Sequence, residues 1–67
     1  MKTFGENLKY ERIMRGLTQT ELANRLGIKQ QQISEWECDK VEPTLYNILA
    51  LIRALNTDFD ELTDGML

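Results

Sequence analysis

Two short amphipathic stretches on either side of Gly27 constrain the fold of this chain more than any other feature of its sequence. In the first stretch, Leu22, Ala23 and Leu26 fall on one face of a helix that begins at about Gln19. Glycine is the residue that most readily takes the left-handed conformation with which many helices end. We therefore expect this helix to stop at Gly27 and a second helix to start directly after it.

The residues around this first helix favour both of its ends. Thr18 and Glu21 have the spacing of a capping box, in which each side chain accepts a hydrogen bond from an amide at the helix start. After Gly27, Ile28 can pack back onto the apolar face as the hydrophobic contact of the cap. The chain is therefore expected to turn sharply at this glycine.

The second helix is expected to run from Lys29 or Gln30 to about Cys38, with Ile33 and Trp36 on its inner face. Four polar residues are then expected to point outward, namely Gln30, Gln31, Ser34 and Glu35. A glutamine carboxamide matches the N6 and N7 groups of adenine in the DNA major groove, and a glutamate can accept from cytosine N4. These four residues are candidates for base contacts, while composition alone also allows a solvated helix face.

Five segments of the chain share a family pattern of caps, glycines and core positions. They are Gly16-Leu17-Thr18-Gln19, Glu21-Leu22-Ala23, Leu26-Gly27-Ile28, Gln31-Gln32-Ile33-Ser34-Glu35-Trp36-Glu37 and Pro43-Thr44-Leu45. In these segments the chain resembles the Cro/XRE helix-turn-helix family of bacterial and phage transcriptional regulators, over about residues 4–62. The resemblance implies an all-α, compact five-helix domain like that of lambda repressor.

The same resemblance implies how the helices are used. The helix-turn-helix would consist of the second and third helices, with the third, at about residues 30–38, in the major groove and the second across the DNA backbone. Lys29 stands where the family usually carries a serine or threonine N-cap, so the third helix lacks a capping side chain. Residues 1–67 would form a single domain with a short tail at 63–67.

The rest of the chain is expected to form helices that brace this pair. The first helix should cover about Phe4–Arg15, with Phe4 and Leu8 inward and Ile13 as a further candidate. Thr44 should cap the fourth helix, Asn56 should end it, and Asp58 should cap a short fifth helix holding Phe59 and Leu62. The expected core residues are Leu8, Leu17, Leu22, Leu26, Ile28, Ile33, Trp36, Leu45, Ile48, Ile52, Leu55 and Phe59.

Glu37 follows Trp36 directly, so its carboxylate is expected to be partly buried, where an unpaired charge is costly. A cationic partner is therefore expected. In related lambdoid repressor domains an arginine of the first helix pairs with the glutamate at this position, and the matching residue here is Arg12. The resemblance thus implies a structural ion pair between Arg12 and Glu37, which would tie the first helix to the end of the third.

The charge of the chain is unusual for a DNA-binding protein, because the formal net charge is −3. Four acids lie in residues 58–67, so residues 1–57 hold 8 basic against 7 acidic residues, a net of +1. Family geometry places Gln19, Lys29 and Lys40 near phosphates. Because so few groups can neutralise phosphates, we expect weak non-specific binding and a homodimer on a pseudo-palindromic operator.

The dimer surface is not named by the sequence. Candidates are the fifth helix and tail, together with outer positions of the fourth helix, namely Phe59, Leu62, Met66, Leu67, Leu49 and Ala50. The acidic residues beside the third helix keep a second function open. In that alternative the fold is a protein-binding module, such as an antitoxin or a regulator of another regulator, with weak or no DNA binding.

Composition argues against other classes of function. The chain has no histidine and a single cysteine, Cys38, so we expect no metal site, no cofactor, no intrachain disulfide and no enzyme activity. Sixty-seven residues leave no room for an effector domain, so no small-molecule effector is expected. No stretch is apolar enough to span a membrane or to act as a signal peptide, so we expect a cytoplasmic protein without membrane contact.

Overall fold

Capping side chains set the start of four of the five helices that form within residues 2–67, the part of the chain that the computed structural model describes. The helices are α1 (Phe4–Met14), α2 (Gln19–Leu26), α3 (Gln30–Glu37), α4 (Leu45–Leu55) and α5 (Phe59–Leu62). Thr3, Thr18, Thr44 and Asp58 each accept a hydrogen bond from an amide in the first turn that follows. The all-α five-helix fold predicted from the sequence is confirmed.

The predicted capping box at Thr18 is present in both directions. The Thr18 hydroxyl accepts from the Glu21 amide at 3.0 Å, and the Glu21 carboxylate accepts from the Thr18 amide at 2.8 Å. The backbone amide and the hydroxyl of Thr18 both hold the pKa of Glu21 below its ordinary value of 4.5. The carboxylate therefore stays charged at the helix end where the dipole favours a negative charge.

The turn between α2 and α3 is the one predicted. Gly27 has a φ of 70°, in the left-handed region, and the amide of Ile28 donates to the Ala23 carbonyl at 3.0 Å. Ile28 is partly buried against the core. Asn56 takes the same conformation after α4, with a φ of 51°, as its position predicted.

Asp39 also takes the left-handed conformation, which was not predicted. It has a φ of 59° and directly follows Cys38, the C-cap of α3, with the amide of Lys40 donating to the Glu35 carbonyl at 3.0 Å. The Asp39 carboxylate accepts from the amide of Gly5 at 2.9 Å, near the start of α1. The chain beyond α3 is thus attached to α1.

Within residues 2–67, eight buried hydrophobic side chains form the core: Leu8, Leu22, Ala23, Ile33, Trp36, Leu51, Leu55 and Leu62. The predicted core was wrong at Leu45, which is 67% exposed, and at Phe59, which is 52% exposed. Leu51 and Leu55 are one turn apart and define the inner face of α4, whereas Leu45 lies six residues before Leu51, well off that face. The single turn of α5 buries Leu62, which leaves Phe59 at the rim.

Two further expectations about side-chain positions were also wrong. Ile13, the additional candidate for the inner face of α1, is 55% exposed because it lies five residues after the buried Leu8, on the other side of the helix. Leu62, a candidate for the dimer surface, is fully buried. The surface of α5 is therefore formed by its other residues.

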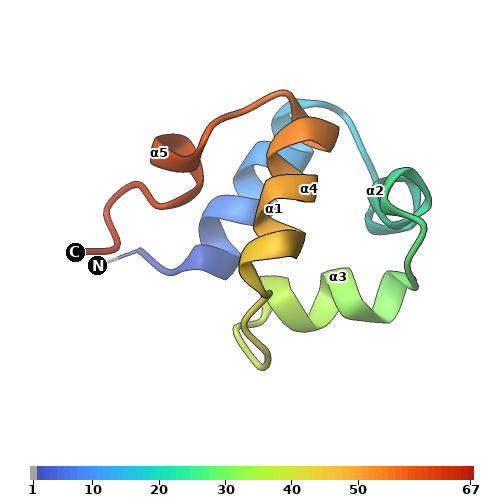
Figure 1. The fold of residues 1–67 in the computed structure, drawn as a ribbon, viewed down its shortest axis with the longest axis horizontal. Coiled ribbons are helices and arrows are strands. Elements are labelled where there is room, and N and C mark those ends of the chain that lie inside the picture. Colours follow the sequence, from blue (N-terminus) through green and yellow to red (C-terminus); the bar gives the residue numbers. More distant parts are fainter. Residues whose placement is uncertain (1) are drawn as a thin grey trace.

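The arrangement of the helices places α2 and α3 together at one end of the molecule and α5 at the other (Figure 1). In this view α4 lies in front of α1, and α3 runs along the lower edge. The two chain ends meet beside α5, where the amide of Lys2 donates to the Gly65 carbonyl at 3.0 Å. None of the helices within residues 2–67 is long and apolar enough to cross a lipid bilayer.

The backbone of the first turn of α1 packs directly against the backbone at the end of α3. A Cβ atom added to Gly5 would lie 2.4 Å from the Glu37 carbonyl oxygen and 2.6 Å from that of Trp36. Since no side chain fits in this space, the glycine allows the two helices to approach closely. This contact, together with the Asp39 hydrogen bond, positions the last turn of α3.

Buried polar side chains of α1 hold the other end of the molecule. The side chain of Asn7 donates to the carbonyls of Leu62 and Asp64 at 3.0 and 2.8 Å, so it satisfies backbone carbonyls at the C-terminal end of α5. Glu11 accepts from Arg15 at 2.8 Å and from Thr57 at 2.9 Å, which ties α1 to the turn before α5. The first helix is therefore the frame to which both ends of the fold are attached.

Candidate nucleic-acid interface

The third helix offers a polar side to solvent because its apolar side is fully used by the core. Ile33 is 0% and Trp36 is 2% exposed. Gln31 lies on the opposite side of α3, and both Gln30 and Gln31 are exposed. Ser34 and Glu35 are half-buried. The four predicted base-contacting residues thus lie away from the helix's core contacts, with the two glutamines extending furthest into solvent.

The two helices of the motif meet at a side chain for which the sequence predicted a different contact. Gln19, the first residue of α2, was expected beside a phosphate. Its Nε2 donates to Glu37 Oε1 at 3.0 Å, and its Oε1 accepts from Gln30 Nε2 at 2.6 Å. Gln19 therefore connects the start of α3 with the residue at its end.

Glu37 is the centre of a cluster of hydrogen-bonded side chains that also contains Arg12, Gln19 and Gln30, called the Gln19–Glu37 cluster below. Arg12 Nε lies 2.6 Å from Glu37 Oε2, and Arg12 Nη2 donates to Oε1 at 3.1 Å, so the ion pair implied by the resemblance is present and has two contacts. The side chains of Arg12 and Glu37 are only 10% and 3% exposed. Arg12 Nη1 also donates to the Leu17 carbonyl at 2.7 Å. Three parts of the chain are thereby linked: α1, the turn before α2, and the end of α3.

The two helix starts differ in how their first amides are paired. At α2 the Thr18 capping box satisfies amides, whereas Lys29 at the start of α3 makes no side-chain cap hydrogen bond, as predicted. The first amides of α3 are therefore left without a side-chain acceptor. Such a helix start favours the binding of an anion, because its amides point outward and the helix dipole adds partial positive charge.

The acidic C-terminal end of the chain lies apart from the two lysines that flank α3. Lys29 and Lys40 flank α3 and are both exposed. Asp58, the N-cap of α5, and Asp60 and Glu61 within α5 lie at the end away from α2 (Figure 1). The acidic tail that lowers the net charge of the chain is therefore remote from the exposed side of α3.

One exposed residue on this side, Cys38, was not among the predicted contact residues. Cys38 ends α3 seven residues after Gln31, which returns it to the same side of the helix. Helical spacing was the only feature of the sequence that could have indicated this position of Cys38. The exposed side of α3 thus continues past Glu35 to Cys38.

This arrangement of α2, Gly27 and α3 is that of a helix-turn-helix domain, and the chain belongs to the helix-turn-helix family of the Cro/C1 (XRE) type. The family model matches residues 8–62. Five helices without strands in residues 2–67 agree with the fold of this family.

Known members resemble the chain over most of its length. A prophage-derived HTH-type transcriptional regulator of Bacillus subtilis, YonR, is 37% identical over 92% of this chain, which spans 57% of YonR. Among solved structures, the P22 c2 repressor bound to a synthetic operator has a TM-score of 0.88 and 32% identity, over 97% of this chain and 98% of that one. The restriction-modification controller protein C.AhdI of Aeromonas hydrophila has a TM-score of 0.83 and 34% identity, over 88% and 89% of the two chains.

The Arg12–Glu37 pair can be tested by stability measurements. Arg12→Met should lower the free energy of unfolding by about 3–5 kcal/mol, because it leaves the buried Glu37 carboxylate without its cation. The double variant Arg12→Met/Glu37→Leu should recover most of this loss, since it leaves neither charge buried alone. Urea denaturation followed by circular dichroism measures both.

Lys9→Met, on the exposed side of α1, is the matched control and should change the free energy of unfolding by less than about 0.5 kcal/mol. An Arg12→Met variant as stable as this control would contradict a structural role for the ion pair.

Proposed function

We propose that this chain is a sequence-specific DNA-binding transcriptional regulator whose α3 enters the major groove. The observation that carries the proposal is the exposed amide side of α3, held at both ends by the Gln19–Glu37 cluster. Further support is that the P22 c2 repressor, which shares this fold at a TM-score of 0.88, is described in complex with an operator. A two-turn helix presented in this way suits the width of the groove.

Base recognition in this proposal depends on four side chains of α3. Gln30 and Gln31 offer carboxamides that pair with adenine at N6 and N7. Ser34 offers a hydroxyl, and Glu35 can accept from the N4 amine of cytosine. Because α3 begins at Gln30, the glutamines lie in the first turn, which is where recognition helices contact bases.

Backbone contacts are assigned to Lys29, Lys40 and Gln19. Lys29 and the uncapped start of α3 form one cationic end, and Lys40 forms the other. Gln19 keeps one amide hydrogen free for a phosphate after its two hydrogen bonds within the protein. Each neutralised phosphate contributes about −0.9 to the salt slope, so two lysines per copy give only modest non-specific binding.

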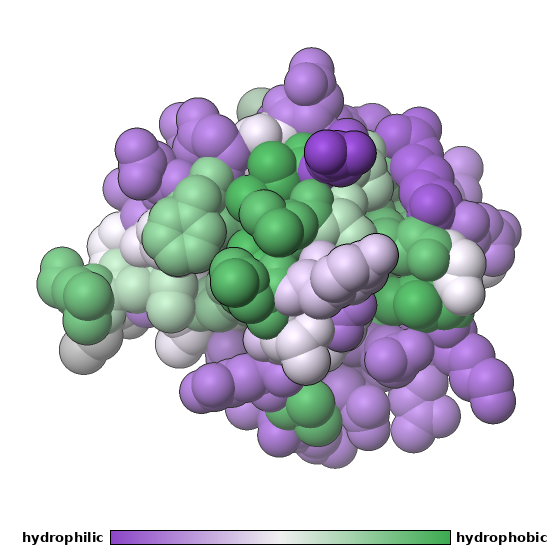
Figure 2. Space-filling model, viewed as in Figure 1, coloured by the Kyte–Doolittle hydropathy of each residue, from purple (hydrophilic) through white to green (hydrophobic). Residues whose placement is uncertain are grey.

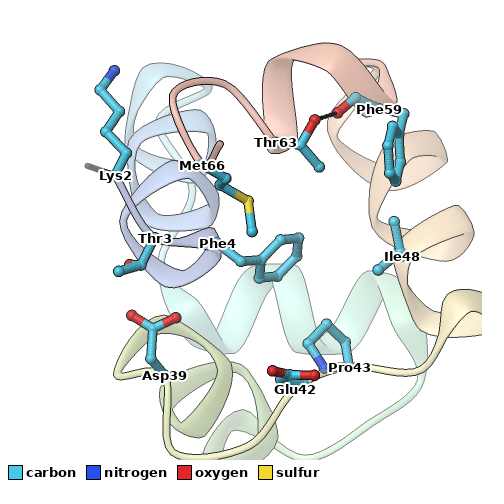
Figure 3. Close-up of a pocket in the computed structure, with 10 residues that line it drawn as sticks. All are labelled: Lys2, Thr3, Phe4, Asp39, Glu42, Pro43, Ile48, Phe59, Thr63 and Met66. Atoms are coloured by element: carbon cyan, nitrogen blue, oxygen red, sulfur yellow. Dashed lines mark hydrogen bonds between the residues drawn. The ribbon is translucent and has the colours of Figure 1, made fainter.

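An exposed apolar face supports the proposal that the chain binds DNA as a homodimer. It is formed by α4, α5 and the adjacent chain ends, and Figure 2 shows hydrophobic side chains gathered on this side of the molecule. Its members are the exposed Leu45, Leu49 and Phe59 and the half-buried Phe4, Ile48 and Met66. Phe4, Ile48, Phe59 and Met66 surround a hollow between α1, α4 and α5 (Figure 3). An open hollow of this kind is typical of an interaction site.

A second copy of the chain is the occupant that the position and charge of this face favour. The face is turned toward the viewer in Figures 1 and 2, while α3 runs along the adjacent lower edge. Two copies joined here by a two-fold axis can therefore keep both α3 helices on one side. Arg53 lies beside Leu49 on α4, and Asp60 and Glu61 lie on α5, so the same axis can bring opposite charges together.

The homodimer would place its two recognition helices about 34 Å apart, which matches a pseudo-palindromic operator. We further propose that the protein acts in the cytoplasm, where bacterial and phage DNA is bound, and that it has no catalytic role and no small-molecule effector. The proposal of no catalytic role rests on the chemistry of a sequence with no histidine and a single cysteine.

DNA binding is tested by selecting sequences from a random duplex pool with the full chain at two salt concentrations. The wild type should enrich one pseudo-palindromic sequence. Gln31→Ala should weaken binding to that sequence by about 5- to 100-fold, since a bidentate base contact is lost. Gln32→Ala is the matched control, because Gln32 lies one turn before the buried Trp36, at the edge of the inner side, and it should bind as the wild type does.

Failure to enrich any sequence, together with a stable protein partner in pull-down, would contradict the proposal and favour a protein-binding module.

The dimer is tested with Leu49→Asp, which adds a charge to the apolar face at a side chain that is 52% exposed. Sedimentation should show a dimer for the wild type on operator DNA and a monomer for the variant, with unchanged circular dichroism. Ile13→Asp is the control, since Ile13 is a similarly exposed residue on α1, outside the apolar face. A Leu49→Asp variant that still binds as a dimer would exclude this face as the interface.

A further inference from the structure

The first helix holds α3 with one of its sides and α5 with another. Gly5 and Arg12 lie seven residues apart, on the side of α1 that contacts the end of α3. Asn7 and Glu11 lie four residues apart on a second side, and each is only 5% exposed. The helix α1 packs against both α3 and α5. The position of α5 relative to α3 therefore depends on these two sets of contacts.

Asn7 holds the C-terminal end of α5. Its Nδ2 group donates to the Leu62 carbonyl at 3.0 Å and to the Asp64 carbonyl at 2.8 Å, so both amide hydrogens are used. A helix of four residues is not stable by itself, because its few internal hydrogen bonds do not offset the cost of helix nucleation. The placement of α5 therefore rests on the buried Leu62 side chain and on the two hydrogen bonds from Asn7.

Glu11 holds the turn that leads into α5. Its Oε1 accepts from the Thr57 hydroxyl at 2.9 Å and from Arg15 Nη1 at 2.8 Å. The Arg15 guanidinium also donates to the carbonyls of Leu55 and Asn56, at the end of α4. Polar side chains of α1 and its C-cap thus hold the chain both before and after α5.

In the homodimer proposed above, α5 lies at the contact between the two copies, because Phe59 belongs to the apolar face. The distance between the two recognition helices then depends on how α5 is placed relative to α3 within each copy. One added base pair between the half-sites moves one of them by about 3.4 Å and turns it by about 35°. A dimer in which α5 cannot move relative to α3 therefore fits one spacing of the half-sites.

We propose that Asn7 and Glu11 are positioning residues that set the spacing between the two half-sites of the operator. The proposal rests on the DNA-binding homodimer proposed above. Both side chains are buried, so they act through α5 and do not contact DNA. A duplex with a wrong spacing must either deform or strain the hydrogen bonds that these two residues make.

The experiment uses the full chain and a duplex pool in which two copies of the selected half-site are separated by a variable number of base pairs. The wild type should prefer one spacing over those one base pair longer or shorter. Asn7→Leu keeps the size of the side chain and removes both donors. It should lower this preference by about fivefold, because strain at a wrong spacing no longer includes these hydrogen bonds. The base preferences within each half-site should persist.

Thr57→Val is the second variant, because it removes only the hydroxyl that donates to Glu11. It should lower the spacing preference in the same direction but by a smaller factor. Lys9→Met, on the exposed side of α1, is the control and should keep the spacing preference of the wild type. Circular dichroism checks the fold of each variant, and if Asn7→Leu does not fold, Thr57→Val alone carries the test.

Three results would overturn the inference while the wild type still selects a pseudo-palindromic sequence. The first is an unchanged spacing preference in the folded variants. The second is a wild type that accepts neighbouring spacings equally well. The third is a loss of base preference within the half-site equal to the loss of spacing preference, which would mean that Asn7 supports only the fold as a whole. A wild type that selects no sequence would instead overturn the proposed function itself.

Discussion

The buried carboxylate of Glu37 is the group on which the placement of the recognition helix depends. A charge that is 3% exposed is unfavourable unless its oxygens are satisfied, and here Arg12 and Gln19 together supply three hydrogen bonds. Each donor comes from a different helix than Glu37. Satisfying this one carboxylate therefore requires α1, α2 and α3 to be in their observed places. The interaction thus fixes the relative positions of the three helices and also contributes to stability.

The close approach of the α1 backbone at Gly5 also holds the end of α3 in place. The backbone of α1 lies directly against the carbonyls of Trp36 and Glu37, and the Asp39 carboxylate accepts from the Gly5 amide. The end of α3 is thus held by an ion pair, a backbone contact and a hydrogen bond, while its start is held by the Gln19–Gln30 bond. A helix attached at both ends can present its exposed side with little rearrangement on binding, which lowers the entropic cost of recognition.

Features that depend on neighbours in the sequence could be predicted, and features that depend on distant residues mostly could not. The Thr18 capping box, the Gly27 turn and the uncapped Lys29 follow from residues within a few positions of one another. The Arg12–Glu37 pair was implied by family resemblance, since no spacing indicates it. The Gln19 bridge and the Asp39–Gly5 bond join residues 11 to 34 positions apart and have no local signal. On α4 and α5 the sequence correctly assigned Leu55 to the core, but it also assigned Leu45 and Phe59, which are exposed.

We propose that a buried charge cluster holds α3 ready to contact bases from one side of a paired molecule. The most direct test is a crystal structure of the chain bound to its selected operator. The predicted result is two copies with α3 in successive major grooves about 34 Å apart, Gln30 and Gln31 within hydrogen-bonding distance of base edges, and Glu37 still bound to Arg12 and Gln19. A complex in which α3 lies away from the bases, or in which Glu37 has released Arg12, would contradict it.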